Sequence, residues 1–253
     1  MSRQETVFVT GGASGIGLAI VQAVLAEGWR AVVADLAQLN LDQARETLRG
    51  SRDLVRFEQL DVADEAAVVG AIARCEAEFG PLTGLVNSAG IASDTPAIDT
   101  TVSLFRKILD VNLLGSFVVC REAARHMREH GAGSIVNVAS VSGIRGNSGR
   151  VAYGASKAGV IMMTKVMAVE WAPFGVRVNA IAPGPVETPL VKEVHTEQAR
   201  ADWHSTVPQR RYGTPHELAG AAIFLLDNRR SSYVTGHTVC VDGGFTAAGL
   251  MGG

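Results

Sequence analysis

The sequence predicts an α/β fold, in which a doubly wound parallel sheet of seven strands is flanked by helices on both faces. Short apolar runs of strand length alternate along the chain with longer segments of helical pattern. Strands that alternate with helices are joined by right-handed crossovers and become parallel neighbours in a sheet that is covered on both faces. With 253 residues, of which 47% are hydrophobic and 19% charged, the chain can bury the core that such a fold needs.

The elements are expected in alternating order from the start of the chain. The strands, which are the short apolar runs, are expected at 6–10, 31–35, 54–60, 84–87, 134–139, 176–181 and 238–241. The helices between them are expected at 16–27, 40–49, 65–79, 101–130, 152–171 and 215–226, with a break near Asn112 in the fourth helix.

One stretch departs from this alternation. Residues 183–214 contain three prolines before Leu190, followed by charged and aromatic residues. We expect a mobile flap here rather than a regular element, because long irregular connections are commonly functional loops. No internal repeat or interdomain linker is visible, so we expect a single domain over 1–253, with the flap at about 183–214.

Composition excludes several classes of protein. The formal net charge is -2 and the charges are interspersed, so we expect neither a nucleic-acid surface nor a polybasic membrane patch. No apolar run is long enough to span a bilayer, and the polar start of the chain shows no signal peptide. Cys75, Cys120 and Cys240 are widely spaced and lack metal-ligand partners, so we expect buried reduced thiols and no metal site. These features favour a cytoplasmic protein.

A glycine-rich turn at 10–17 joins the first expected strand to the first helix. Glycines permit a tight turn and a close approach of the backbone to phosphate, and the helix N-terminus offers unpaired amides. The spacing differs from the usual dinucleotide fingerprint, but the position after the first strand favours a dinucleotide site. The residues expected to bind the pyrophosphate are Gly11, Ser14, Gly15, Ile16 and Gly17.

Asp35 ends the second expected strand, eighteen residues after Gly17. A carboxylate there can accept hydrogen bonds from both hydroxyls of the adenosine ribose, and it would repel a 2′-phosphate. No Arg or Lys lies in the glycine loop or directly after Asp35, which is followed by Leu36, so we expect NAD rather than NADP. Asp61, with Val62, is placed to receive the adenine amino group, although an Asp in this position is also an ordinary turn residue.

Tyr153 and Lys157 lie four residues apart, so a helix would place both side chains on one face. A free phenol has a pKa of about 10 and is a poor base at neutral pH. We expect the Lys157 ammonium, together with a cationic cofactor ring, to favour the phenolate and to lower the pKa of Tyr153. A shift of about three units requires roughly 4 kcal/mol of differential stabilisation.

Taken together, the motifs resemble those of the short-chain dehydrogenase/reductase family in its short, single-domain, NAD-preferring form. The resemblance covers essentially the whole chain and implies a Rossmann-type fold. After the glycine loop, the family's motifs follow in order as Asn87-Ser88-Ala89-Gly90, Asn112, Ser140, Tyr153, Lys157, Pro183-Gly184 and Thr188. One departure is Ser88, where many members carry a second Asn.

The resemblance implies a role for each of these residues. Tyr153 is expected to be the general base in alcohol oxidation and the acid in ketone reduction, while Ser140 binds the substrate oxygen. Lys157 is expected to hold the ribose of the nicotinamide half, and Asn112 to kink its helix and position a water that links Lys157 to solvent. The remaining cofactor contacts are expected from Asn87, Ala89 and Gly90, which line the cleft, and from Pro183, Gly184, Val186 and Thr188, which pin the carboxamide.

Residues around the expected substrate mouth receive no chemical role. A solvated flap surface is expected for His195, Trp203, His204, Arg210 and Arg211, with contact to the substrate as the alternative. Three residues that precede Tyr153 are candidates for lining the mouth, namely Arg145, Asn147 and Arg150.

Two helical segments, 113–124 and 158–171, are apolar around more of their circumference than packing on a sheet requires. We expect these two long helices to form a homodimer with their symmetry mates, extended to a homotetramer as the resemblance implies. Deep burial under the flap within one chain is the alternative. The apolar residues 245–251 are a candidate for a second interface.

Three functions remain open. The first is an NAD(H)-dependent oxidoreductase that interconverts a small secondary alcohol, polyol, sugar or hydroxy compound and its ketone. The second is a 3-oxoacyl-(acyl-carrier-protein) reductase, which shares nearly every motif but usually uses NADPH, a cofactor against which Asp35 argues. The third, a non-catalytic NAD-binding regulator, is disfavoured by the intact set of Ser140, Tyr153 and Lys157.

Overall fold

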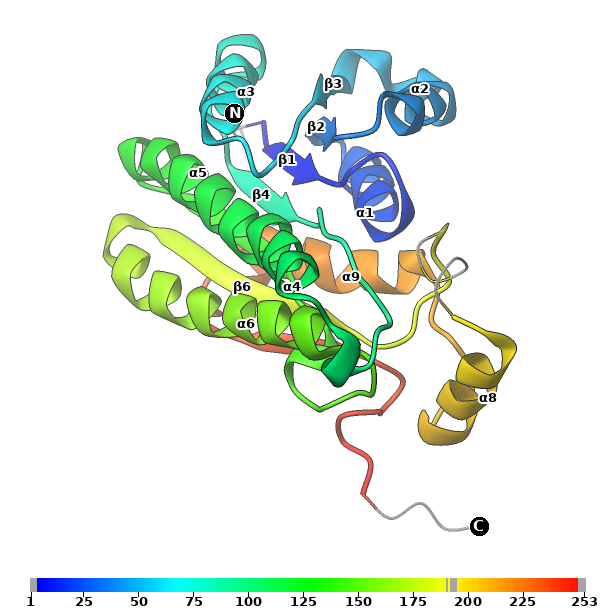
Figure 1. Cartoon of the computed structure of the whole chain (residues 1–253). Helices are drawn as coiled ribbons and strands as arrows, with labels where there is room; N and C mark the ends of the chain where they lie inside the picture. Colours follow the sequence, from blue (N-terminus) through cyan, green and yellow to red (C-terminus); the bar gives the residue numbers. More distant parts are fainter. Residues whose placement is uncertain (1–3, 190, 192–194, 250–253) are drawn as a thin grey trace.

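Seven parallel strands form one sheet in the order β3-β2-β1-β4-β5-β6-β7 (Figure 1). The computed structural model describes residues 4–189, 191 and 195–249. The strands are β1 (Thr6–Thr10), β2 (Arg30–Asp35), β3 (Val55–Gln59), β4 (Gly84–Asn87), β5 (Gly133–Val138), β6 (Val176–Pro183) and β7 (Thr238–Val241). The predicted doubly wound fold is confirmed, and every predicted strand is present, although β6 runs on through Pro183.

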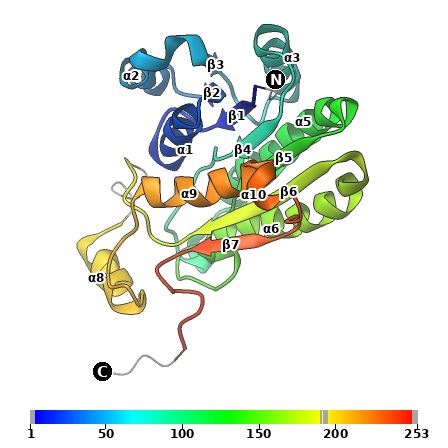
Figure 2. The same cartoon turned by 180° about the vertical axis from the view of Figure 1, so that it is seen from behind.

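Helices cover both faces of this sheet (Figures 1 and 2). They are α1 (Gly15–Ala26), α2 (Gln38–Thr47), α3 (Glu65–Phe79), α4 (Val102–Leu109), α5 (Ser116–His130), α6 (Val151–Trp171), α8 (Glu197–Thr206), α9 (Pro215–Leu226) and α10 (Asn228–Ser231). Helices α1, α2 and α9 bury apolar side chains in one core, and α3, α5 and α6 bury theirs in a second core on the opposite face. No helix in the described ranges is long and apolar enough to cross a membrane.

The predicted break near Asn112 is a π-helical segment, Asp110–Gly115, that joins α4 to α5. Such segments carry wider turns than an α-helix and are frequent at functional sites. Asn112 itself is fully buried in this segment. The wider turn therefore directs a polar side chain into the protein, towards α6.

The expectation of an irregular flap is wrong for residues 197–206, because these form the regular helix α8. Thr196 caps its start by accepting a hydrogen bond from the amide of Ala199 at 3.2 Å. Trp203 of α8 packs against Phe245, with ring centroids 5.0 Å apart. A capping Thr and an apolar anchor help to order the helix, and short helices of this kind are easily missed in polar sequence. The part of the flap at 190 and 192–194 lies outside the described residues.

The cysteines also differ from expectation in one case. Cys75 and Cys120 are buried, as predicted, whereas Cys240 is exposed in the single chain. The reason is topological, because Cys240 lies on β7, at the edge of the sheet.

Candidate active site

The candidate site lies where the strand order reverses, at the carboxyl ends of β1 and β4. Thr10 and Asn87 are register partners at these ends. The Thr10 hydroxyl accepts hydrogen bonds from the amides of Ser88 and Ala89, both at 3.2 Å. A Cβ on Gly11 would lie 2.8 Å from the Ala89 nitrogen, so only glycine allows the two loops to approach this closely. Open α/β sheets bind ligands in the crevice at this reversal point.

The loop after β1 has the form of a phosphate cradle. Gly11 and Gly15 have φ angles of 59° and 53°, which favour glycine. A Cβ on Gly17 would overlap the carbonyl oxygen of Gly11. Ser14 is the N-cap of α1 but makes no capping hydrogen bond with its side chain, and the first-turn amides of an α-helix have no partner within the helix. These free donors at a helix N-terminus fit the pyrophosphate of a dinucleotide.

Asp35 lies beside this loop at the end of β2 and is almost entirely buried. Its Oδ2 accepts a hydrogen bond from the amide of Ala13 at 3.4 Å, and its Oδ1 accepts one from the amide of Ala37 at 3.1 Å. These contacts fix the carboxylate at the edge of the crevice, where remaining lone pairs suit ribose hydroxyls. The next side chain, Leu36, is exposed and carries no charge that would attract a 2′-phosphate.

Asp61 is a turn residue, which was the alternative to an adenine contact in the sequence analysis. Its Oδ1 accepts a hydrogen bond from the amide of Ala63 at 2.9 Å. Val62 is buried against Gly115, where an added Cβ would lie 2.8 Å from Cγ2 of Val62. The contact of Asp61 and Val62 with adenine therefore stays a prediction.

Tyr153 and Lys157 lie one turn apart on α6, with Nζ of Lys157 5.8 Å from the centroid of the Tyr153 ring. The ammonium donates a hydrogen bond to the carbonyl of Val138, at the end of β5, at 2.8 Å. Ser140 follows β5, and its Oγ accepts a hydrogen bond from the amide of Ser142 at 3.1 Å. The structure thus brings the three predicted catalytic side chains together at the carboxyl end of β5.

The expected lowering of the Tyr153 pKa by Lys157 is wrong for the protein alone. Burial raises the pKa of Tyr153, while hydrogen bonding to Ser140 and the positive charge of Arg150 oppose that rise only in part. Burial also lowers the pKa of Lys157 to about 8, since the side chain is only 5% exposed. Desolvation therefore outweighs the attraction between charges for Tyr153, and Arg150, which sequence reasoning considered only for the substrate mouth, contributes to lowering its pKa.

Asn112 connects the π-helical segment to the catalytic helix. Its Oδ1 accepts a hydrogen bond from the amide of Ile91 at 2.8 Å, and its Nδ2 donates to the carbonyl of Ile91 at 2.9 Å and to Oγ of Ser156 at 3.1 Å. A Cβ on Gly90 would lie 3.1 Å from Oδ1 of Asn112 and 3.5 Å from Nζ of Lys157. Asn112 therefore positions the segment after β4 beside Lys157, and its role in a proton relay stays a prediction.

The side chain of Asn87 turns into the protein. It donates hydrogen bonds to Oδ1 of Asn137 and to Sγ of Cys120, both at 3.0 Å, and Asn137 donates in turn to Oγ1 of Thr164 at 2.9 Å. Asn137 and Thr164, both fully buried, were missed by sequence reasoning, and a polar residue inside the apolar strand β5 was the available signal. In the segment 87–90, Ser88, Ala89 and Gly90 are not buried and remain available to line the crevice.

The segment after β6 closes the opposite side of the crevice. A Cβ on Gly184 would lie 2.8 Å from Cα of Asp242, so this turn packs directly on the segment after β7. Val186 forms an isolated bridge with Gly213. A Cβ on Gly15 would lie 3.5 Å from the methyl carbon of Thr188, which places 183–188 next to the phosphate cradle.

A small inner pocket of about 80 Å³ opens above the catalytic side chains. It adjoins a larger hollow of about 440 Å³, here called the vestibule. The inner pocket is lined by Ala92, Ser140, Val141, Ser142, Arg150, Tyr153, Gly184, Pro185, Val191, His195 and Trp203. The vestibule is lined by Asp94, Arg145, Gly146, Asn147, Ser148, Arg150, His195, Ala199, Asp202, Trp203, Thr206 and Phe245.

These linings test the predictions for the substrate mouth. Arg145, Asn147 and Arg150 all line the vestibule, as suggested by their position before the catalytic tyrosine. The expectation of a solvated surface is wrong for His195 and Trp203, which line both cavities because α8 folds the flap back over the site. Only the fold of the flap could reveal this, since both residues lie far from Tyr153 in sequence.

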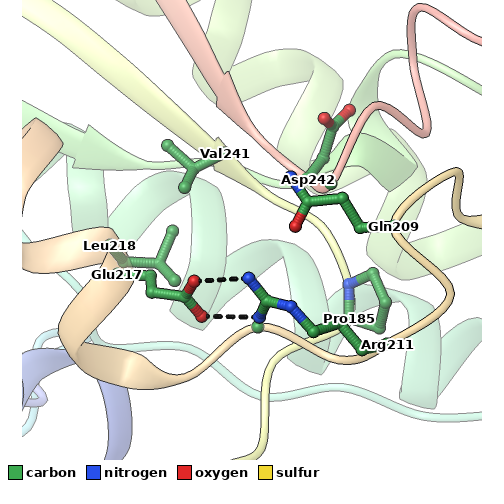
Figure 3. A pocket seen from close by; sticks show the side chains of 9 residues that line it. Pro185, Gln209, Arg211, Glu217, Leu218, Val241 and Asp242 are labelled. Atoms are coloured by element: carbon green, nitrogen blue, oxygen red, sulfur yellow. Dashed lines mark hydrogen bonds and ion pairs between the residues drawn. The ribbon is translucent and has the colours of Figure 1, made fainter.

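A separate hollow of about 130 Å³ lies between the end of β7 and the start of α9 (Figure 3). Its main feature is the ion pair of Arg211 and Glu217, with two hydrogen bonds of 2.9 and 2.7 Å. Glu217 also accepts from the amide of Thr214 at the start of α9, and these bonds lower the pKa of Glu217 to about 2. Neither Ser140 nor Tyr153 lines this hollow, so it is not the reaction site. The bonds of Glu217 to Arg211 and Thr214 fix the segment before α9 to the start of that helix.

Among the described residues, no group of three or more His, Cys, Asp or Glu side chains could hold a metal ion.

The comparisons with known proteins agree on one family for this chain. Residues 11–246 match the family model described as enoyl-(acyl carrier protein) reductase.

The chain is 40% identical to 2-(R)-hydroxypropyl-CoM dehydrogenase of Xanthobacter autotrophicus, with 98% of this chain and 100% of that protein covered. It is 39% identical to the 3-oxoacyl-[acyl-carrier-protein] reductase FabG of Thermotoga maritima, with 95% and 97% covered. The solved structure of ElxO with NADP bound superimposes with a TM-score of 0.91 at 31% identity, covering 97% of this chain and 100% of the other. The extent of these matches and the arrangement of Ser140, Tyr153 and Lys157 beside a glycine cradle show that the chain belongs to the short-chain dehydrogenase/reductase family.

Proposed function

We propose that the protein is an NAD(H)-dependent oxidoreductase that interconverts a small secondary alcohol, polyol, sugar or hydroxy compound and its ketone. The observation that carries this proposal is that Ser140 and Tyr153 line one pocket, with the ammonium of Lys157 behind them, 5.8 Å from the centroid of the Tyr153 ring and hydrogen-bonded to the end of β5. The similarity to a dehydrogenase of a 2-hydroxypropyl compound supports the reaction type. We further propose that residues 1–253 act as one domain in which 183–214 cover the substrate.

The nicotinamide cofactor supplies a hydride acceptor or donor when bound. The residues of the chain supply placement and proton transfer. Tyr153 takes the hydroxyl proton of the alcohol in oxidation and returns it to the ketone oxygen in reduction. The Ser140 hydroxyl hydrogen-bonds the same oxygen and stabilises its developing charge. Lys157 has three N–H donors and uses one on the Val138 carbonyl, so the others suit the ribose hydroxyls of the cofactor.

The choice of NAD rests on Asp35. Its carboxylate is held at the end of β2 by the amides of Ala13 and Ala37, next to the cradle. In this position it favours two free ribose hydroxyls and repels a 2′-phosphate. Leu36 offers no compensating positive charge.

A 3-oxoacyl-(acyl-carrier-protein) reductase is the second candidate. The similarity to the 3-oxoacyl-[acyl-carrier-protein] reductase of Thermotoga maritima favours it. Both candidates use the same proton-transfer residues, and they differ in the substrate that enters the vestibule. Asp35 favours the first candidate, since the second usually goes with NADPH.

We also propose that α5 and α6 form a homodimer with their symmetry mates and that two dimers form a homotetramer. Leu114 before α5 and Phe117 on it are partly exposed, as are Met162, Val166 and Val169 on α6. These side chains face solvent in the single chain, so the alternative of burial under the flap is wrong. An exposed apolar surface on two neighbouring helices is typical of a protein interface.

The test is a screen of secondary alcohols with NAD and NADP, and of ketones with NADH and NADPH, for the wild type and Tyr153→Phe. We expect turnover with NAD(H), and a loss of about 10²–10⁴-fold in kcat for Tyr153→Phe, the usual contribution of a general acid-base group. The affinity for NAD should stay within about threefold of the wild type, since the ring remains in place. Tyr233→Phe, which changes a fully exposed tyrosine, is the control. Normal turnover in Tyr153→Phe would refute the assignment.

A further inference from the structure

Arg150 is the charged residue that lines both the inner pocket and the vestibule. Its guanidinium carbon lies 5.7 Å from the centroid of the Tyr153 ring, and its side chain is only 12% exposed. A guanidinium is always charged at physiological pH and presents five N–H donors in a planar fork. A permanent positive charge is therefore held at the entrance to the reacting groups.

The contact that holds Arg150 does not neutralise it. Nη2 of Arg150 lies 3.1 Å from Nε2 of His195, and Nδ1 of His195 lies 2.9 Å from the hydroxyl of Tyr212. Because a guanidinium can only donate, Nε2 of His195 must accept, and the imidazole is neutral with its proton on Nδ1. Burial, and then the charge of Arg150, lower the pKa of His195, in agreement with a neutral ring.

No carboxylate forms a close, buried ion pair with Arg150 in the part of the chain that the structure describes. Among the described residues, the nearest carboxylate oxygen is Oδ2 of Asp94 at 3.8 Å, and that side chain is 43% exposed. Asp202 also lines the vestibule, but its Oδ1 accepts from the side chain of Gln198 at 2.8 Å. Arg145, the other cation of the vestibule, donates to the carbonyl of Phe245 at 2.7 Å. The guanidinium of Arg150 thus has further N–H groups that can donate to an anion in the cavity. Such charge-assisted hydrogen bonds are strong.

Resting on the proposed function, we infer that the substrate is a secondary alcohol or ketone that carries an anionic group, and that Arg150 binds this group in the vestibule. Trp203 and Phe245 line the vestibule with apolar surface on which a short carbon chain can lie. The reacting oxygen then reaches Ser140 and Tyr153 in the inner pocket, while the anionic group stays on the side of Arg150 that faces the vestibule. His195 is a positioning residue, because it holds Arg150 while remaining uncharged.

The test compares matched ketones with and without a charge. Acetoacetate, 4-oxopentanoate and 5-oxohexanoate are reduced in parallel with their methyl esters, and a methyl-ketone sulfonate of similar length separates carboxylate from sulfonate recognition. In the wild type, at least one anion should exceed its ester in kcat/KM. Arg150→Gln should lower kcat/KM for the preferred anion by roughly 10- to 100-fold, mainly through KM, as expected for the loss of a hydrogen bond to a charged group. At neutral pH the phenol of Tyr153 that ketone reduction needs is protonated in both proteins, so the ester should lose clearly less kcat/KM than the anion, and Arg49→Gln, at an exposed site outside the cavities, is the matched control.

Binding is measured separately through the fluorescence of Trp203, with Trp203→Phe to identify its signal, by titrating the anions into the complex with NAD. Saturable binding of an anion to the wild type that is lost in Arg150→Gln supports the anion site. If such binding occurs without turnover of any ketone, the anion site stands and only the proposed reaction is refuted. Turnover of esters and anions with equal kcat/KM, or equal losses for both in Arg150→Gln, would overturn the inference and leave the oxidoreductase standing. Absence of both binding and turnover would overturn both.

Discussion

Lys157 lies within 5.8 Å of the centroid of the Tyr153 ring, yet its ammonium donates its hydrogen bond to the backbone of β5. Lys157 is buried and Tyr153 is half-buried at the inner pocket, and for both the uncharged form is favoured by desolvation. The protein alone therefore holds a protonated phenol beside a destabilised cation. A bound cofactor would supply hydroxyl partners for the ammonium of Lys157 and positive charge beside the phenol of Tyr153. Cofactor binding should therefore stabilise the charged forms of both side chains, and in this way prepare Tyr153 for proton transfer.

The raised pKa of Tyr153 predicts a pH dependence. Alcohol oxidation needs the phenolate as base, so kcat/KM for oxidation should rise with pH above neutrality, by up to about tenfold per pH unit. Ketone reduction needs the phenol and should be favoured at neutral pH. The charge of Arg150 lowers the pKa of Tyr153, so Arg150→Gln should move the oxidation profile to higher pH. Profiles measured with an uncharged alcohol check this, and identical profiles for the variant and the wild type would contradict it.

Lys157→Met is predicted to stabilise the cofactor-free protein while abolishing activity. The folded pKa of about 8 lies below the ordinary value of 10.5, so between these limits the unfolded state binds more protons and the stability of the wild type rises with pH. The methionine variant should therefore gain up to about 3 kcal/mol at about pH 7, at 1.36 kcal/mol per unit, and this gain should vanish towards about pH 10.5.

Urea unfolding at several pH values measures this gain. Lys107→Met, on the exposed side of α4, is the control and should change little at any pH. A methionine variant that is less stable than the wild type at neutral pH would show that the hydrogen bond to Val138 outweighs the burial of the charge.

The alternation of short apolar runs with helical segments was enough to predict the sheet and six of its covering helical segments. The sequence also predicted the glycine cradle, Asp35 and the pair of Tyr153 and Lys157 on α6, because each lies at the end of a strand or on one helix face. It could not predict the contact of Arg150 with His195, because these side chains are 45 residues apart and meet only when the flap folds. The network under β4 was hidden for the same reason, because Asn87 and Asn137 meet only when β4 and β5 pair in register.

Asp35→Asn is predicted to weaken the preference for NAD over NADP. The amide oxygen can keep the contact with the amide of Ala37, but the charge that repels a 2′-phosphate is removed. The ratio of kcat/KM for NAD to that for NADP should fall by roughly 10- to 100-fold, which corresponds to about 1.4–2.8 kcal/mol. Asp42→Asn, on the exposed side of α2, is the control. An unchanged ratio would mean that Asp35 serves only to fix the loop after β1.

Val169→Asp is predicted to dissociate the assembly. Val169 lies on α6 and is 78% exposed in the single chain, so a carboxylate there costs little in the monomer. In a twofold interface the substitution buries two like charges, each at a penalty of several kcal/mol, which should raise the dissociation constant by more than about 100-fold. Sedimentation velocity at about 10 μM should then show a species of lower mass than the wild type, whereas Leu39→Asp, at a residue of α2 that is 68% exposed, should sediment like the wild type. A wild type that is monomeric at this concentration, or a Val169→Asp variant of unchanged mass, would exclude α6 as the interface.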